Sequence, residues 1–166
     1  MIESPPKTFD GLDFWHARHG NLAAVGTALS VASLGAARLA LRRQRGVGGE
    51  VIAVEPKFLL VAPELELVGE QILAQVNAAK TEDVNPFAGR LELIVEPHLI
   101  DANAWYLAAS PGQIGMEYAY LEGSERPQVE TRIGFDIDGT EWKVRLDFGG
   151  GFADTRGIFK NPGVAP

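Results

Sequence analysis

The sequence predicts an α+β fold, in which one helix leads into a compact mixed domain of short strands and a further helix. Three observations support this prediction. Small apolar residues recur at steps of three and four positions through residues 29–45, which is typical of a helix. After residue 50, short runs rich in β-branched and aromatic residues alternate with proline and glycine, which is typical of strands. Residues 64–79 show helical spacing again.

The first helix is expected over residues 29–45. Its apolar positions form one stripe that should be buried, namely Leu29, Ala32, Ala36, Leu39 and Ala40. Thr27 and Ser30 are both suitable residues for the N-cap. The last turn carries three arginines, Arg42, Arg43 and Arg45. Cations are favourable at this end of a helix, and the glycines that begin at Gly46 should end it.

The remaining elements are predicted in order along the chain. Residues 1–28 are expected to be irregular and anchored by the aromatic residues Phe9, Phe14 and Trp15. Strands are predicted at residues 51–54, 58–61, 91–95, 105–109 and 116–121. The second helix begins after Pro63, because proline is preferred at the first helical position. The glycines at 149–151 should end a strand, and pairing should resume over residues 155–159.

The clearest local signal is a β-hairpin over residues 131–148. Asp138 and Gly139 are the dipeptide that a two-residue type I′ turn prefers, and alternating residues flank it. This turn predicts three pairs on one face, Phe135 with Trp142, Ile133 with Val144, and Thr131 with Leu146. That face is expected to be buried.

The other face of the predicted hairpin is charged. The same register places Arg132 opposite Arg145 and Asp136 opposite Glu141. Like charges directly across a ladder repel each other unless diagonal residues compensate. The unbalanced face is therefore a weak indication of a partner outside the chain.

Composition restricts the possible functions. With 166 residues, of which 46% are hydrophobic and 22% charged, the chain is typical of one soluble globular domain. The net charge of −7 argues against general nucleic-acid binding, which needs clustered lysine and arginine. The absence of cysteine excludes disulfides and cysteine-based zinc sites. The uncharged run at residues 20–37 contains polar residues and glycines, so we expect no membrane span and no signal peptide, and a cytoplasmic product.

One group of residues has the chemistry of an active site. His16 and His19 lie close in sequence to Asp10 and Asp13, and imidazole and carboxylate groups bind metals and carry protons. A small metal-assisted hydrolase is therefore an alternative function. The spacing matches no helical ligand pair and no third ligand follows at a telling distance, so we expect no catalytic residue, no metal and no cofactor.

Several stretches of the sequence, taken in their order along the chain, resemble a known protein family. They are LSVASLGAARLALRRQ, EPKFLLVAPELE, VNPFAGRLELIVEP, AWYLAASP, MEYAYLEGSERPQVETRIGFDIDG and VRLDFGGGFADTRGIFKNPG, and FWHARHGNLAA precedes them. Together they resemble the carboxy-terminal half of a major capsid protein of tailed bacteriophages. The most similar group is the prophage type, in which the capsid protein is often fused behind a prohead protease. The resemblance covers about residues 9–163.

The resemblance implies the Hong Kong 97-type capsid fold. Residues 29–45 would be the spine helix, about 50–125 a mixed axial domain, and about 129–160 the strands that return to the peripheral domain. These parts make a capsid-like domain over residues 29–163, preceded by the irregular segment 1–28. The implied fold is truncated, because the amino-terminal arm and the extended loop of the family would have to precede the spine helix.

The implied function is that of a structural subunit, or a truncated fragment, of a phage or prophage head shell. Such a protein acts by self-assembly and not as an enzyme, and its partners are copies of itself or full-length capsid protein. It meets packaged DNA only indirectly, does not associate with a membrane, and passes from the bacterial cytoplasm into the virion head shell. The candidate interface residues are Arg42, Arg43, Arg45, Arg132, Asp136, Glu141 and Arg145. A domesticated capsid fragment that acts as an interaction module is a further alternative.

Overall fold

The computed structural model describes residues 2–74, 89–134 and 138–164. These residues form two compact units, the first made of Met1–Gly115 with Phe152–Pro166 and the second of Met116–Gly151. Among the described residues, no helix has the length and apolar character needed to cross a bilayer.

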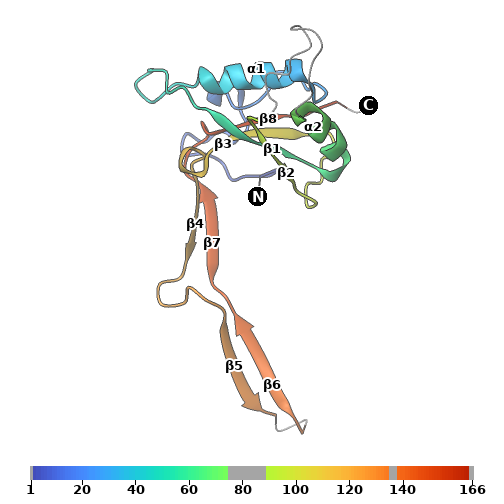
Figure 1. Ribbon diagram of the computed structural model, residues 1–166. Coiled ribbons are helices and arrows are strands. Elements are labelled where there is room, and N and C mark those ends of the chain that lie inside the picture. The colour runs from blue at the N-terminus through green and yellow to red at the C-terminus, as the bar shows by residue number, and fades with distance from the viewer. Residues whose placement is uncertain (1, 75–88, 135–137, 165–166) are drawn as a thin grey trace. The chain divides into compact units, whose positions relative to one another are not determined.

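The first unit is built on a four-stranded sheet with the strand order β2-β1-β3-β8 (Figure 1). Its strands are β1 (Pro56–Val61), β2 (Glu92–Val95), β3 (Trp105–Ala109) and β8 (Ile158–Asn161). β1 runs parallel to β2 and antiparallel to β3, and β3 runs antiparallel to β8. The sheet is therefore mixed, as the α+β prediction requires. Leu22 of the amino-terminal segment forms one isolated parallel bridge with Lys160 of β8.

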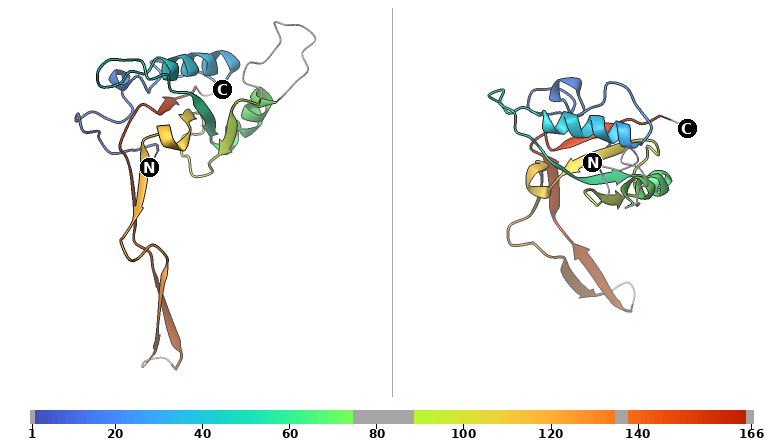
Figure 2. Two further views of the ribbon diagram at one scale, coloured as in Figure 1. Left: turned by 60° about the vertical axis from the view of Figure 1, so that its left-hand side comes forward. Right: turned by 45° about the horizontal axis from the view of Figure 1, so that its top comes forward.

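Helix α1 (Val31–Arg42) lies across one face of this sheet, as Figures 1 and 2 show. Its N-cap is Ser30, which forms a reciprocal capping box with Ser33. The helix exists, but it ends at Arg42 with Arg43 as its C-cap, before the predicted end at residue 45 and the glycines that begin at Gly46. The predicted buried stripe is wrong in part, because only Leu29 and Ala40 of its five residues pack in the core. The buried residues of α1 are Leu34, Ala37 and Leu41, whereas Ala32, Ala36 and Leu39 are exposed. The reason is that apolar residues surround most of this helix, so that periodicity alone cannot identify the buried face.

The second helix, α2, covers Glu66–Leu73, and a short 3-10 helix, η2 (Pro63–Leu65), precedes it. Pro63 is at the start of η2, as the sequence predicted. The predicted end of the helix, residues 75–79, lies outside the described residues. Two further 3-10 helices are η1 (Ala17–His19) and η4 (Pro111–Gln113). The predicted strand at residues 51–54 is wrong, because its only strand-like contact is a single bridge between Val51 and Arg45.

The sheet of the first unit is covered on both faces. Alternate residues of the strands, such as Leu59, Trp105 and Leu107, pack with α1 and α2 in the main core. The residues between them, such as Tyr106 and Ala108, face two smaller clusters. The amino-terminal segment supplies the cover on that side, through Ile2, Phe14 and Trp15. Phe14 and Trp15 thus anchor the segment as predicted, but Phe9 does not, because it is 97% exposed.

The second unit is a two-stranded ribbon made of two ladders. β4 (Met116–Tyr120) pairs with β7 (Phe148–Phe152), and β5 (Gln128–Ile133) pairs with β6 (Thr140–Arg145). The prediction that the glycines at 149–151 end a strand is wrong, since they lie within β7. Pairing with a neighbouring strand outweighs the low strand propensity of glycine here.

The hairpin of β5 and β6 forms, but the predicted register is wrong. Ile133 opposes Thr140 instead of Val144, a shift of four residues along β6, and the Gly134 N–H donates to the Gly139 carbonyl at 2.9 Å. A shift by an even number leaves each side chain on its predicted face, so the alternating pattern cannot fix the register. Phe135 and Asp136, which the prediction also paired, lie outside the described residues.

The observed register removes the predicted charge repulsion. Arg132 lies opposite Glu141, and Glu130 lies opposite Lys143, so opposite charges face each other across the ladder. The predicted pairs of Arg132 with Arg145 and of Asp136 with Glu141 are therefore wrong. Opposite charges in directly opposed positions stabilise this register over the predicted one.

The apolar face of the hairpin is not buried, contrary to the prediction. Ile133 is 86% exposed, Trp142 72% and Val144 66%. A hairpin of two strands has no second layer of its own that could cover one face, and a two-stranded ribbon alone is only marginally stable. The sequence pattern correctly indicates which face is apolar, but not that it is exposed.

Candidate functional site

The predicted group of histidines and aspartates assembles only in part. His19 Nε2 lies 3.0 Å from Asp10 Oδ2, and His19 Nδ1 lies 2.9 Å from the carbonyl oxygen of Phe14. Carboxylate and carbonyl oxygens only accept hydrogen bonds, so this geometry favours the imidazolium form of His19, in which both ring nitrogens donate. Burial lowers the pKa of His19, but the hydrogen bonds to Asp10 and Phe14 outweigh this and raise the pKa above its ordinary value. Hydrogen bonds from the Thr8 hydroxyl and from His19 lower the pKa of Asp10.

His16 and Asp13 are not part of this pair. The centroids of the His16 and His19 rings are 5.8 Å apart, and His16 Nδ1 accepts a hydrogen bond of 3.2 Å from the backbone N–H of Arg18. Asp13 is exposed. In the described part of the chain, no three His, Cys, Asp or Glu side chains converge as metal ligands would. The geometry therefore gives no support to the metal-assisted hydrolase.

A cleft of about 420 Å³ lies beyond the carboxy-terminal end of α1, within the first unit. Arginines from three separate parts of the chain line it, namely Arg18, Arg43, Arg45 and Arg156. We call it the arginine cleft. The buried Gln44 joins two of these parts, because its Nε2 donates to the His19 carbonyl at 3.0 Å. This hydrogen bond holds the segment around His19 against the segment that carries Arg43 and Arg45.

Two of the three predicted helix-end arginines, Arg43 and Arg45, line this cleft. Arg45 also donates to the Gly49 carbonyl at 2.7 Å. Arg42 is not a lining residue, and its Nη2 lies 2.7 Å from Glu55 Oε1. That ion pair is solvent-exposed, and exposed pairs contribute about 0–1 kcal/mol to stability.

The charged face of the β5–β6 hairpin carries balanced charges. Its ion pairs join Arg132 with Glu141, Lys143 with Glu130, and Arg145 with Asp147. The distance from Lys143 Nζ to Glu130 Oε2 is 3.2 Å, and that from Arg145 Nε to Asp147 Oδ2 is 3.0 Å. The candidate residues Arg132, Glu141 and Arg145 therefore have partners within the hairpin. Asp136 lies outside the described residues.

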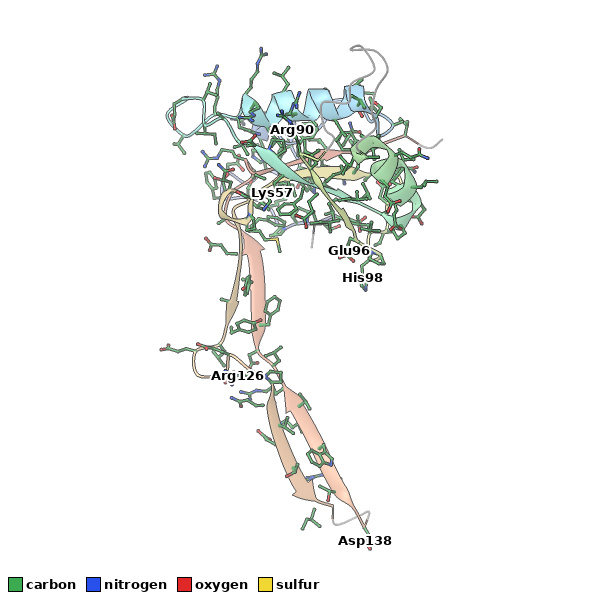
Figure 3. The ribbon with its side chains drawn as sticks, viewed as in Figure 1. Lys57, Arg90, Glu96, His98, Arg126 and Asp138 are labelled. Carbon is green, nitrogen blue, oxygen red and sulfur yellow. The ribbon has the colours of Figure 1, made fainter. Side chains whose placement is uncertain are left out.

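The opposite face of this hairpin is an exposed apolar surface. It consists of Val129, Thr131 and Ile133 from β5 with Thr140, Trp142 and Val144 from β6, and we call it the hairpin apolar face. Figure 3 shows side chains that project from both faces of this ladder. The β4–β7 ladder adds three exposed aromatic rings, Tyr118, Tyr120 and Phe148, with centroids 5.7–6.3 Å apart. Exposed apolar groups of this kind are typical of protein–protein contact surfaces.

The sequence indicated only part of these surfaces. It pointed to Arg43 and Arg45 through their clustering at a helix end, but Arg18 and Arg156 are distant in sequence and have no local signal. The hairpin apolar face was recognised as apolar and wrongly placed in the core. One signal of its exposure was available in the sequence. The apolar pattern is regular, but no predicted element would cover the hairpin.

A family model described as "Phage capsid protein" matches residues 4–161. A comparison with curated proteins finds no match. The match therefore covers nearly the whole chain, including both units.

Two solved structures are similar to the chain. One is a phage-related protein from Bordetella bronchiseptica RB50, with a TM-score of 0.61, 12% identity and 92% of this chain covered. The chain spans 58% of the length of that protein. The other is a structure of the satellite phage P4 procapsid including size determination protein, with a TM-score of 0.44, 14% identity and coverage of 78% of this chain and 37% of that one.

Proposed function

Because this chain belongs to the phage capsid protein family, we propose that it is a structural subunit of a phage or prophage head shell that acts by binding copies of itself. The family is structural and not enzymatic, so its members have their place in the shell of a virion or procapsid. We extend this to the chain itself, which we propose has no catalytic activity and is made in the bacterial cytoplasm before assembly.

The observation that carries the proposal is the hairpin apolar face. A shell subunit must present surfaces that neighbouring copies cover, and tryptophan is enriched among the residues that dominate protein–protein binding energy. Trp142 is 72% exposed and lies opposite Thr131 in the ladder. Leaving such residues in water is unfavourable by about 25 cal/mol per Å² of apolar surface, which supports a role in contact with another subunit.

The candidate interface residues take different places in this proposal. Arg43 and Arg45, in the arginine cleft, are proposed to contact a neighbour directly. Arg132, Glu141 and Arg145 are proposed to lie at the margin of the contact, because they are already paired within the hairpin. Arg42, which pairs with Glu55, is assigned to the same margin. Asp136 keeps its proposed interface role from the sequence alone.

The division of the chain is also a proposal. It follows from the resemblance to Hong Kong 97-type capsid proteins. The proposed parts are an irregular segment at 1–28, a spine helix at 29–45, an axial domain at about 50–125 and return strands at about 129–160. In support, α1 lies within the second range and β6, β7 and most of β8 lie within the last.

Sedimentation velocity and electron microscopy of the purified chain test the proposal. We expect concentration-dependent oligomers, with full-length capsid protein as an alternative partner. Trp142→Ser should raise the dissociation constant at least tenfold, because loss of a central tryptophan costs about 2 kcal/mol or more in such interfaces. Lys143→Ser, next to it on the charged face, is the matched control and should change the constant much less.

A chain that remains monomeric at all concentrations, and that does not bind full-length capsid protein, would contradict the proposal. Metal analysis supplies a second criterion: bound metal that is lost in His19→Ala would favour the hydrolase alternative. An interaction module would instead bind full-length capsid protein without forming oligomers of its own.

A further inference from the structure

The arginine cleft carries more positive charge than its own carboxylates neutralise. Asp10 is occupied by His19, with 3.0 Å between Oδ2 and Nε2, and Asp154 Oδ1 lies 2.8 Å from Arg156 Nε. Among the described residues, no ion pair neutralises Arg18, Arg43 or Arg45. All three side chains are exposed. The cleft therefore presents guanidinium groups that have no carboxylate partner.

The edge of the cleft is apolar as well as cationic. Phe9 and Val47 both line it, and they are 97% and 93% exposed. Phe9 and Val47 lie far apart in sequence, and the fold brings them to the same cleft. A fitting ligand therefore combines carboxylates with apolar groups.

The second unit has the opposite imbalance. Three of its cations, Arg132, Lys143 and Arg145, are paired along the charged face. Its remaining described acidic residues are Glu117, Glu122, Glu125 and Asp138, all exposed and without an ion pair among the described residues. The one other described cation of this unit is Arg126, so the unpaired residues are mainly acidic. Figure 3 labels Asp138 at the end of the hairpin and Arg126 near the loop between β4 and β5.

We propose that the arginine cleft of one copy binds the acidic hairpin unit of a second copy, and that this contact sets how neighbouring subunits join. The proposal rests on the self-association argued above and names the surfaces that meet. Guanidinium groups bind carboxylates through paired hydrogen bonds, and the apolar rim of the cleft matches the apolar residues beside those carboxylates. The contact is heterologous, since the two surfaces differ, and such contacts form rings or extended arrays.

A protein segment fits the cleft better than a nucleic acid. The chain as a whole carries a charge of −7, and nucleic-acid binding needs an extended positive surface. The exposed apolar side chains of Phe9 and Val47 also interrupt the positive surface that a nucleic-acid backbone would follow.

Charge reversal on each side tests the contact. The cleft variant is Arg43→Glu with Arg45→Glu, and the hairpin variant is Glu122→Arg with Glu125→Arg and Asp138→Arg. Each variant alone should raise the dissociation constant for self-association at least tenfold. An equal mixture of the two should restore binding, because the intact cleft of one then meets the intact hairpin of the other.

Lys57→Glu with Arg90→Glu is the control for net charge. It changes the charge as much as the cleft variant does, but outside the cleft. This control should associate like the unmodified chain. Binding of unmodified protein should also weaken as sodium chloride is raised, because salt screens the exposed charges.

The outcomes separate this inference from the proposed function. If the unmodified chain does not associate, the proposed function fails. If it associates and the cleft variant associates equally well, only this inference fails. Binding of a fluorescent single-stranded oligonucleotide that the cleft variant loses, with unchanged self-association, would assign the cleft to nucleic acid and overturn the inference. A chain that carries both sets of substitutions should associate again, because its reversed cleft meets a reversed hairpin, and a chain of this kind that stays monomeric would also overturn the inference.

Discussion

Thr27 and Asn161 bind each other through two hydrogen bonds of 2.9 Å. The backbone N–H of Thr27 donates to Asn161 Oδ1, and Asn161 Nδ2 donates to Thr27 Oγ1. Asn161 is 4% exposed, and its Oδ1 also accepts from the backbone N–H of Gly163 at 2.9 Å. One side chain of β8 thus holds the segment that leads into α1.

Asn161→Ala should destabilise the first unit, because it leaves the N–H groups of Thr27 and Gly163 without their acceptor. We expect the free energy of unfolding to fall by about 1–3 kcal/mol, which is the cost of an unsatisfied buried group, because the two N–H groups are only partly buried. Urea unfolding measures the change. Thr27→Val removes only the hydroxyl partner and should cost about 1 kcal/mol. Equal effects of the two variants would contradict this account.

Leu41→Ala should be far more destabilising than Leu39→Ala. Leu41 is fully buried in the main core, and Leu39 is 51% exposed on the other side of α1. A buried leucine truncated to alanine costs about 2–5 kcal/mol, and we expect less than about 1 kcal/mol at Leu39. Thermal or urea unfolding distinguishes them. The reverse order would mean that α1 buries the stripe suggested by its sequence.

The His19–Asp10 pair should stabilise the fold most in mildly acidic solution. The pKa of His19 is raised above 6.5, so its contribution is complete below 6.5 and is lost as pH rises through the higher folded-state value. The pKa of Asp10 is lowered from 3.8, so its contribution is present above 3.8 and is lost at lower pH. We therefore expect the maximum between these two values.

A proton NMR titration of His19 checks this expectation directly. The pKa should be above 6.5 in the unmodified chain and should fall in Asp10→Asn, which removes the negative partner. Urea unfolding of His19→Gln should lose the pH dependence above 6.5 that the unmodified chain shows. An unchanged His19 pKa in Asp10→Asn would exclude the pair as its cause.

The register of the β5–β6 hairpin can be tested by cross-linking, because the chain has no cysteine. Val129 opposes Val144, and alternation from the Gly134–Gly139 bond makes this a pair without hydrogen bonds. In such pairs the Cα atoms are about 4.5 Å apart, close enough for a disulfide. Val129→Cys with Val144→Cys should therefore oxidise to an intramolecular disulfide, seen as loss of free thiol in the monomer.

Ile133→Cys with Val144→Cys is the matched control for the register. These residues would be opposed if Asp138 and Gly139 formed a two-residue turn. In the observed register they are offset by four residues, which is about 13 Å along a strand. Efficient cross-linking of this pair, and not of the first, would restore the two-residue turn.

The sequence predicts well those elements whose signal is local. β3 occupies Trp105–Ala109 as predicted, because an apolar run between loop residues has few alternatives in a mixed sheet. Ser30 caps α1 for a similar reason, since the capping box needs only Ser33 nearby. The features that failed depend on distant partners: which face of α1 is buried is decided by the sheet, and the hairpin register is decided by the charges on both strands.

The candidate surfaces follow the same rule. Arg43 and Arg45 stand together in the sequence, whereas Arg18 and Arg156 reach the cleft only because the segment around Leu22 pairs with β8. The His19–Asp10 pair was suggested by proximity in sequence, but proximity did not indicate that His16 and Asp13 stay apart from it. The types of neighbouring residues do not predict which of their side chains point toward one another.

β3 and β8 are neighbours in the sheet, and the whole second unit, Met116–Gly151, lies within the connection between them. Its entry and exit meet at the hydrogen bond of 2.7 Å from the Ala153 N–H to the Gly115 carbonyl. Because these two points are already joined, we expect that the ribbon can be excised, lengthened or replaced by a foreign peptide while the strand order of the sheet stays the same.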